Sequence, residues 1–589
     1  MKGPKYVSHF FQSLPFIWII ILLISSCQQG GNLPEADPDN GGLFLPDGFE
    51  AVVVVDSIGR ARHLTVNDNG DIYVKLRVPN EAGQGIVALR DTDGNGKADL
   101  IETFGDYPDT GNYGTGMEIH NGYLYFSTAG EVYRTRLDPE KLVPEGEVEL
   151  IMKDDYKNAV HGYEHIAKPI AFDNQGYMYI PFGSPGDVCQ EFNRRPGAPG
   201  LNPCPQLEWH GGIWRFDANK LNQTQQDGYR YATGIRSVVA MDWNEKENSL
   251  YVVQHGRDNL HRTWPDLFSR WESAVLPSEE FFKVEEGTDG GWPYYYYDQI
   301  REKKLLNPEY GGDKEKATGA ENVEWPLLGF PGHFAPNDLY FYQGDQFPDR
   351  YKDGAFVAFH GSTIRGPYPQ GGYFVGFVPF EDGKPSGPWE VFADGFAQLD
   401  TIVNTGDAAA RPMGISMGPD GSLYITESVQ GKIWRVMYTG DKSEFGEAAL
   451  AKLEERKNSR TNIKNPDEQK DNLEKGLLET GAQTYNIYCA TCHQTNGKGD
   501  GTRFPPLSET EWVTANRGPN RKRLISLLLN GLEGQVEVNG VAYNGIMPAH
   551  SFLSDAEVAG VLTYIRKSFG NNASSISAAE VAQVRKELK

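Results

Sequence analysis

Two cysteines and a histidine near the C-terminus have the spacing of a covalent haem-attachment motif. Cys489, Cys492 and His493 form the pattern C-x-x-C-H, which attaches c-type haem. A helix-like segment over 473–485 precedes the motif. Further along the chain, Met547 stands in the sequence Gly-Ile-Met-Pro, where the following proline favours an extended loop. The chemistry that these residue types allow is one-electron transfer at a haem iron.

The region over 475–572 resembles a class I monohaem cytochrome c. Its last amphipathic helix opens with a capping box, Ser554 to Glu557. The resemblance implies thioether bonds from Cys489 and Cys492, His493 as the proximal iron ligand and Met547 as the distal ligand. A methionine ligand stabilises Fe(II) and raises the reduction potential, which suits an electron acceptor. Two alternatives stay open: Met547 is an ordinary core residue, or another side chain such as His550 is the sixth ligand.

The first 27 residues resemble a bacterial lipoprotein signal. Lys2 and Lys5 precede an apolar run over 16–24, and Ser-Ser-Cys27 follows it. The run is short for a bilayer span, so we expect cleavage and lipidation at Cys27, with an uncleaved anchor as the alternative. Residues 28–41 have the composition of a flexible tether. We therefore expect the mature protein outside the cytoplasm, attached to a membrane by lipid.

The two remaining cysteines, Cys189 and Cys204, bracket a loop rich in proline and glycine. Such a pair suits a disulfide in an oxidising compartment. With Cys27 carrying lipid and Cys489 and Cys492 carrying haem, all five cysteines of the chain then have a role.

The long middle of the chain, residues 42–438, repeats one phrase: an apolar run, a polar turn and an aromatic-rich strand. The matching strand aromatics are Tyr73, Tyr125, Tyr179, Tyr251, Phe356 and Tyr424. A strand–turn–strand unit cannot bury its own apolar face, so these units are expected to stack radially. We predict a multidomain protein, an all-β six-bladed propeller followed by an all-α class I cytochrome c domain. A β-sandwich is the alternative for the middle region.

Several phrases of this region resemble the glucose/sorbosone dehydrogenase family. They are His165-Ile-Ala-Lys-Pro, Thr233-Gly-Ile-Arg-Ser, Val253-Gln-His-Gly-Arg-Asp-Asn, Gly290-Gly-Trp-Pro-Tyr, Phe359-His-Gly-Ser-Thr-Ile-Arg and Ala410-Arg-Pro-Met-Gly. The cysteine loop and the run Gln346-Phe-Pro-Asp-Arg-Tyr are similar to the sorbosone-type branch. The family consists of six-bladed propellers that use pyrroloquinoline quinone (PQQ) with calcium. The resemblance therefore implies PQQ and Ca²⁺ as cofactors.

Carried over position by position, the resemblance implies a catalytic base beside a cofactor. His165 matches the base that takes a hydroxyl proton as hydride leaves the substrate. Glu164 matches an acid that orients this imidazole. Arg236 matches an arginine that pairs with the quinone oxygens, and Arg411 matches one whose planar fork faces the cofactor carboxylates.

Further positions are implied around the same cofactor. His360 and Arg365 belong to a region that reaches the same pocket, and the carbonyls of Gly256 and Arg257 match calcium ligands, with Asp258 nearby. Three positions depart from the family pattern: Ser237 replaces an asparagine, Glu427 replaces an aspartate, and Asn112 is the candidate for a polar glutamine. These departures bear on how tightly PQQ binds.

A second calcium site is predicted in the loop that runs from Asp91 to Glu102. Oxygen ligands fall at positions 1, 3, 5, 9 and 12 of a calcium loop, with a carbonyl at position 7 and glycine at position 6. These ligands are Asp91, Asp93, Asn95, Lys97, Asp99 and Glu102. No helical pattern flanks the loop, so we expect a calcium-stabilised hairpin and not a sensor EF-hand. A polar turn without calcium is the alternative.

Charge and domain order complete the functional prediction. The formal net charge of −24 leaves no basic surplus for nucleic acid. We expect a charged linker over 439–474 and a C-terminal tail over 573–589. The predicted protein is an extracytoplasmic dehydrogenase that oxidises a sugar or polyol with PQQ and passes electrons through its own haem to a respiratory acceptor. The alternative is a PQQ-free propeller that binds a glycan or a protein partner, with the cytochrome as an electron carrier.

Overall fold

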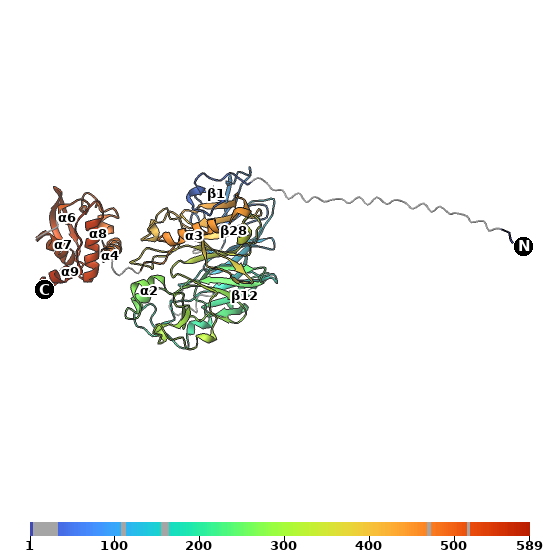
Figure 1. Ribbon diagram of the computed structural model, residues 1–589, viewed down its shortest axis with the longest axis horizontal. Helices are drawn as coiled ribbons and strands as arrows, with labels where there is room; N and C mark the ends of the chain where they lie inside the picture. The colour runs from blue at the N-terminus through green and yellow to red at the C-terminus, as the bar shows by residue number, and fades with distance from the viewer. Residues whose placement is uncertain (4–32, 108–113, 155–163, 468–472, 515–518, 589) are drawn as a thin grey trace.

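Six sheets, antiparallel except for the short edge strands of two of them, and a helical domain make up the computed structural model (Figure 1). It describes residues 1–3, 33–107, 114–154, 164–467, 473–514 and 519–588. Cys27 and Asn112 lie outside the described residues. Across these ranges, no helix combines the length and the apolar character that a bilayer crossing requires.

Each sheet is one blade of a propeller, which confirms the predicted fold. The first blade is β2–β5 (Ala61–Val66, Ile72–Leu76, Ile86–Arg90, Leu100–Phe104), and the second is β6–β9 (Met117–His120, Tyr123–Ser127, Glu131–Arg136, Glu149–Lys153) with β13 (Gln223–Thr224) at its edge. The third is β10–β12 with β14 (Ala171–Phe172, Tyr177–Phe182, Gly212–Asp217, Tyr229–Thr233) and β18 (Thr288–Asp289). The fourth is β15–β17 with β21 (Val238–Asn244, Ser249–Gln254, Glu279–Val284, Leu328–Phe330). The fifth is β22–β24 with β27 (Pro336–Phe341, Ala355–Phe359, Phe374–Val378, Glu390–Ala393). The sixth is β28–β30 (Pro412–Met417, Leu423–Glu427, Ile433–Tyr438) with β1 (Phe49–Val55).

Smaller elements decorate the blades. They are α1 (Leu260–Thr263), α2 (Arg270–Val275), the hairpins β19–β20 (Tyr295–Asp298, Lys303–Leu306) and β25–β26 (Phe380–Glu381, Lys384–Pro385), and the 3₁₀ turns η1 (Asn40–Gly42), η3 (Pro205–Glu208), η4 (Gln225–Asp227), η5 (Pro308–Tyr310), η6 (Ala320–Asn322), η7 (Asp349–Tyr351), η8 (Thr405–Asp407) and η9 (Lys442–Glu444).

The ring closes because the N-terminal strand completes the last blade. β1 pairs antiparallel with β30, from Phe49 opposite Tyr438 to Val55 opposite Ile433. Both faces of each blade pack on neighbouring blades, so apolar side chains fill the spaces between the sheets. The aromatic positions seen in the sequence lie in these layers, where Tyr73, Tyr125 and Tyr179 are buried.

Carboxylates join neighbouring blades near the propeller axis. The first strands β15, β22 and β28 lie side by side around this axis. Asp242 on β15 accepts the Phe341 N–H of β22 at 2.7 Å, and Asp338 on β22 accepts the Ile415 N–H of β28 at 2.7 Å. Burial raises the pKa of Asp242 to about 7 and that of Asp338 well above its ordinary value. These two contacts hold three successive blades together.

The segment predicted as a charged linker folds in part onto the propeller. Helix α3 (Glu447–Ser459) lies along β27, and Arg456 pairs with Asp394 at 2.6 Å. Farther on, Asn462 accepts the Gly372 N–H at 2.9 Å and the Pro466 carbonyl accepts the Trp271 Nε1–H at 2.5 Å. We call residues 447–466 the strap.

The C-terminal domain is built on crossing helices. Its elements are α4 (Leu473–Tyr488), α5 (Ala490–His493), α6 (Glu511–Thr514), α7 (Pro519–Asn530), α8 (Asp555–Lys567), α9 (Ala578–Glu587), and the hairpin β31–β32 (Leu532–Val538, Val541–Met547). Gly481 on α4 meets Gly560 on α8 so closely that a Cβ at Gly481 would lie 2.0 Å from the Gly560 carbonyl oxygen. The hairpin adds strand to a domain expected to be helical, and it places Met547 at the end of β32, where a Pro-flanked loop was expected.

Candidate functional site

The predicted haem residues surround one apolar cavity. Cys489, Cys492, His493 and Met547 all line it. His493 Nδ1 lies 2.9 Å from the Pro505 carbonyl oxygen, which can only accept, so Nδ1 carries the hydrogen and Nε2 keeps its lone pair. Burial lowers the pKa of His493 and keeps the ring neutral. Two thiols, a neutral imidazole and a thioether in an apolar cavity fit a covalently bound haem. His550 also lines the cavity, so it remains an alternative iron ligand.

A second group of polar residues lies at one end of the propeller axis. In an antiparallel blade, the chain enters the first strand at the same end at which it passes from the second strand to the third. His165, Arg236 and Arg411 precede the first strands β10, β15 and β28, whereas His255 and His360 follow the second strands β16 and β23. We call this end the mouth. The topology therefore brings residues from four blades to one place.

The mouth fixes the protonation state of His165. Its Nδ1 lies 2.7 Å from the Ser184 carbonyl oxygen and 3.0 Å from Ser184 Oγ, and that hydroxyl donates to the Gly186 carbonyl at 2.6 Å. Nδ1 therefore carries the hydrogen, and Nε2 is left as an acceptor. Burial and the neighbouring Arg236 hold the pKa of His165 well below its ordinary value. The imidazole is neutral and ready to take a proton.

Glu164 does not orient His165, contrary to the prediction. Its carboxylate accepts from Asn193 Nδ2 at 2.6 Å and from Arg194 Nη2 at 2.9 Å. The carboxylate thus pairs with the loop that follows Cys189 and not with the imidazole. The backbone and hydroxyl of Ser184 orient the ring in its place.

Arg236 lies next to His165 and is held by a residue that the sequence did not reveal. The Ser184 N–H donates to the Arg236 carbonyl at 2.8 Å. Arg236 pairs with the Asp187 carboxylate at 2.6 Å and donates from Nε to the Asp187 carbonyl at 3.0 Å. Burial alone would raise the pKa of Asp187, but Arg236, Arg257 and Arg194 lower it to about 2. Asp187 is therefore an anion that compensates Arg236.

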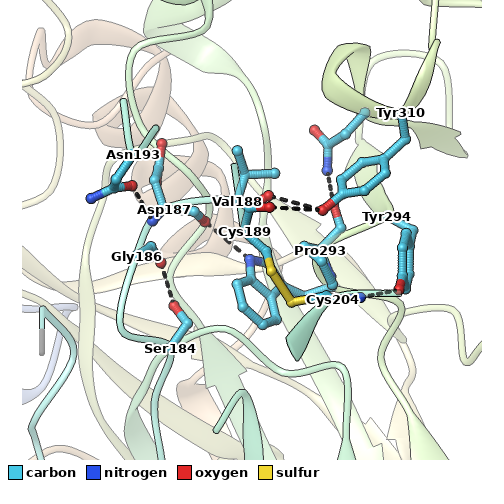
Figure 2. The surroundings of a disulfide bond; sticks show 12 residues. Ser184, Gly186, Asp187, Val188, Cys189, Asn193, Cys204, Pro293, Tyr294 and Tyr310 are labelled. Carbon is cyan, nitrogen blue, oxygen red and sulfur yellow. Dashed lines mark hydrogen bonds between the residues drawn. A yellow bond between two sulfur atoms is a disulfide. The ribbon is translucent and has the colours of Figure 1, made fainter. Parts of the chain in front are cut away.

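A disulfide lies two residues beyond Asp187, as Figure 2 shows. Cys189 and Cys204 are joined at an S–S distance of 2.01 Å. The Tyr310 hydroxyl donates to the Val188 carbonyl at 3.1 Å, and the Cys204 N–H donates to the Tyr294 hydroxyl at 3.0 Å. These contacts fix the backbone that carries Asp187.

Four arginines gather on the other side of the mouth. Burial, together with the charges of Arg77, Arg411 and Arg60, lowers the pKa of Arg62 to about 9. In the part of the chain that the structure describes, Arg60, Arg62 and Arg411 make no ion pair with a carboxylate, and the buried Arg62 Nε has no hydrogen-bond partner. In a chain of net charge −24, three arginines that lie together without a carboxylate partner among the described residues point to an anionic ligand.

His360 contacts Arg411 of this cluster, and His255 contacts Arg236, whose Nη1 donates to the His255 carbonyl at 3.3 Å. Arg411 Nη2 lies 2.8 Å from His360 Nδ1, and Arg411 Nε donates to the His360 carbonyl at 3.1 Å. Burial and the charges of Arg411 and Arg62 lower the pKa of His360. The pKa of His255 is lowered to about 4 by burial and by Arg236. His360 and Arg411 thus lie together as predicted, and Arg62 is the member that the sequence missed.

Arg365 lies away from this group, contrary to the prediction. Its side chain is fully buried, donates to the Gly332 carbonyl at 3.1 and 3.2 Å, and lies 4.8 Å from the Phe334 ring centre. The loop after His360 turns the side chain inward, so that it anchors the loop. Glu427 is also structural, since its carboxylate accepts four backbone N–H groups from 429–432.

Neither predicted calcium site is assembled in the structure. The Gly256 carbonyl accepts from Arg236 Nη1 at 2.8 Å, and Asp258 pairs with Arg194 at 3.0 Å. In the β4–β5 hairpin, Asp91 accepts the backbone N–H groups of Gly94 and Gly96, and Asp99 accepts from Thr92. Among the described residues, no three His, Cys, Asp or Glu side chains gather to hold a metal ion. These oxygens instead accept hydrogen bonds from guanidinium and N–H groups.

Fold and site together define a six-bladed propeller with a basic axial mouth, joined to a c-type cytochrome domain. The family model described as TrAA12-like matches residues 43–439, and the cytochrome c model matches residues 478–568. The chain belongs to the TrAA12-like family and carries a cytochrome c domain.

Two sets of known proteins are similar to this chain. Cytochrome c-552 of Thermus thermophilus is 45% identical over 99 residues, which are 16% of this chain and 66% of that protein. The fructose dehydrogenase cytochrome subunit of Gluconobacter japonicus is 27% identical over 146 residues, 24% of this chain and 30% of that subunit. The holo form of the pyranose dehydrogenase PQQ domain from Coprinopsis cinerea superposes with a TM-score of 0.53 at 18% identity, covering 67% of this chain and 97% of that domain. A Trichoderma reesei AA12 structure gives 0.53 at 17% identity, covering 68% and 98%. These structural likenesses show the fold.

Proposed function

We propose that the protein is a quinoprotein dehydrogenase that oxidises a sugar or related alcohol with PQQ and passes the electrons to its own c-type haem. The observation that carries the proposal is the mouth itself: a neutral base, His165, lies at the same end of the propeller axis as Arg236 and the pair of Arg411 and His360. The PQQ domain of a pyranose dehydrogenase shares the fold, which supports this assignment. We further propose that the protein acts outside the cytoplasm, attached to a membrane through lipid on Cys27.

The residues of the mouth fit PQQ. PQQ carries three carboxylates and, when bound, supplies a two-electron oxidant. Arg62 and Arg411 would hold these carboxylates, because guanidinium forks match carboxylate geometry. Neither of these two arginines pairs with a carboxylate in the described part of the chain. Arg236 is already oriented by Asp187 and would face the polar edge of the same cofactor.

His165 is the base that would accept the proton of the substrate hydroxyl. With Nδ1 donating to Ser184, the lone pair of Nε2 accepts the hydroxyl proton as the carbon–hydrogen bond is broken. The positive charge that then forms on the ring lies close to the anionic Asp187, which stabilises it. Haem, when bound at Cys489 and Cys492, supplies a one-electron acceptor in the same chain.

Haem reduction by sugars tests the proposal. The full-length, haem-loaded protein is mixed with PQQ, calcium and a panel of aldoses and polyols while the haem α-band is recorded. We expect reduction that needs both PQQ and a sugar. His165→Ala should abolish it, whereas His120→Ala, which removes a ring stacked on Phe172 outside the mouth, should not. No reduction by any sugar, together with no PQQ binding, would leave a binding propeller with an electron-carrier domain.

A further inference from the structure

We propose that the loop over 360–372, between the second and third strands of the fifth blade, is the docking surface for the chain's own cytochrome domain. The electron-transfer part of this inference rests on the proposed function, but the docking itself does not.

The strap brings the chain from the far end of the propeller to the mouth. β30 ends at Tyr438 on the far end, because third strands run from the mouth outward. The strap then follows β27 and ends against Trp271 of α2, which belongs to the connection between the second and third strands of the fourth blade. Lys457 packs on Trp389 with its Nζ 4.0 Å from the ring centre, so the strap is held along its length. The last described strap residues therefore lie at the mouth.

Little chain separates the strap from the cytochrome domain. Residues 468–472 stand between Asp467 and the start of α4 at Leu473. Six Cα steps span at most about 20 Å. The linker predicted over 439–474 is thus reduced to a short connection, and the cytochrome domain is confined to the mouth end of the propeller.

One contact, supported by one electrostatic interaction, places the cytochrome helices on mouth loops. A Cβ built on Gly366 would lie 2.4 Å from Gln483 Nε2, so the amide of this α4 residue covers the Gly366 backbone. Burial raises the pKa of Tyr564 on α8, and the charge of Asp407 in η8 adds to this effect. Gly366 and Asp407 lie in the fifth-blade loop and in the chain leading to β28, which are both mouth connections.

The 360–372 loop is rigid where it meets the cytochrome. Arg365 is buried beneath it, the Gln370 N–H donates to the Ile402 carbonyl at 2.8 Å, and Gly372 bonds to the strap residue Asn462 in both directions. The other end of the loop is His360, which contacts Arg411. One short, anchored loop thus connects the arginine cluster with the surface of α4.

The haem attachment residues are close to this contact. Gln483 and Cys489 are six residues apart along α4 and its end, which corresponds to about 9 Å of helix rise. The 360–372 loop therefore connects Arg411, which is proposed to hold the cofactor, with the helix that leads to Cys489. This arrangement accounts for three features of the loop: the buried Arg365 anchors it, the strap bonds to Gly372, and Gly366 leaves room for Gln483.

An engineered disulfide tests the docking without any substrate. All the cysteines of the described residues are committed, so Gly366→Cys combined with Gln483→Cys adds a unique thiol pair to the haem-loaded, full-length protein. We expect this pair to cross-link spontaneously, as detected by non-reducing peptide mapping. Glu245→Cys combined with Gln483→Cys is the matched control, because Glu245 lies in the β15–β16 turn at the far end. Cross-linking no faster than in this control would overturn the proposal.

A second pair guards against misfolding of the Gly366 variant. Asp407→Cys with Tyr564→Cys should be bridged by a short bismaleimide, and absence of the bridge in the folded protein would equally overturn the proposal.

Insertion of a 30-residue Gly/Ser segment after Asp467 then tests electron transfer, which should slow about tenfold as the effective concentration falls. Cross-linking without sugar-dependent haem reduction would retain the docking and reject the proposed function. Sugar-dependent haem reduction without cross-linking would retain the proposed function and reject the docking.

Discussion

Replacing Asp242 with asparagine should stabilise the propeller above neutral pH. The carboxylate lies near the axis between the fourth and fifth blades, where it accepts the Phe341 N–H at 2.7 Å. Asparagine keeps an acceptor oxygen for this bond but cannot ionise, so the substitution isolates the contribution of the charge.

The sign and the size of the expected change in stability follow from the pKa of Asp242. Burial raises the pKa of Asp242 from 3.8 to about 7. An acid whose pKa is raised by folding contributes stability below its unfolded pKa, and this contribution is lost as the pH rises through the folded value. Each pH unit between the two values corresponds to about 1.4 kcal/mol, so the ionised carboxylate lowers the free energy of unfolding by up to about 4 kcal/mol at pH 8. Asp242 is only partly buried, so screening by solvent reduces this figure.

Thermal unfolding of the wild type and Asp242→Asn at pH 5 and pH 8 measures the effect. A gain of about 2 kcal/mol would raise the Tm by several degrees at pH 8, and the difference should shrink at pH 5. Asp420→Asn is the matched control of opposite sign, because Asp420 pairs with Arg435 at 2.7 Å and its pKa is lowered. A lower Tm for Asp242→Asn at pH 8, or an equal change at both pH values, would refute the reasoning.

Two further predictions concern the two domains separately. Arg62→Gln should weaken PQQ binding by about 10- to 100-fold, since one charge-assisted contact contributes about 1.5–3 kcal/mol. A titration that follows PQQ absorbance compares this variant with the control Arg136→Gln. Equal affinities of the two variants for PQQ would show that Arg62 does not bind the cofactor. Gly481→Ala should destabilise the cytochrome domain by about 1–3 kcal/mol, because its methyl group would meet the Gly560 carbonyl; loss of the haem Soret band on heating measures this, and an unchanged midpoint would contradict the close helix crossing.

The repeated phrases of the sequence were enough to predict the blades. Their aromatic residues recur because each blade must pack on both neighbours, and Tyr73, Tyr125 and Tyr179 are indeed buried between sheets. The strap was not predictable, because α3 has no wide apolar face. Its charged side chains make the contacts instead: Arg456 pairs with Asp394, and Lys457 covers Trp389.

Only those residues of the candidate site that stand in sequence phrases shared with the family could be predicted. His165, Arg236, Arg411 and His360 stand in such phrases, and the structure brings them to one mouth. Arg62 and Asp187 belong to no local pattern, since their roles depend on charges from other blades. Glu164 and Arg365 were predicted to be in the site, but their side chains bind elsewhere. The direction of a side chain depends on its local backbone and on the residues packed against it.

The closure of the ring by β1 and β30 has a consequence for synthesis of the protein. Contacts at this closure, such as Thr439 with Gly48, join residues 391 positions apart. At about 5–20 residues per second, the first strand waits roughly 20 to 80 s for its partner to be made. During that time the strand Phe-Glu-Ala-Val-Val-Val-Val is an unpaired, apolar edge of the kind that promotes aggregation. The nascent chain therefore depends on protection of its first strand until the last blade is complete.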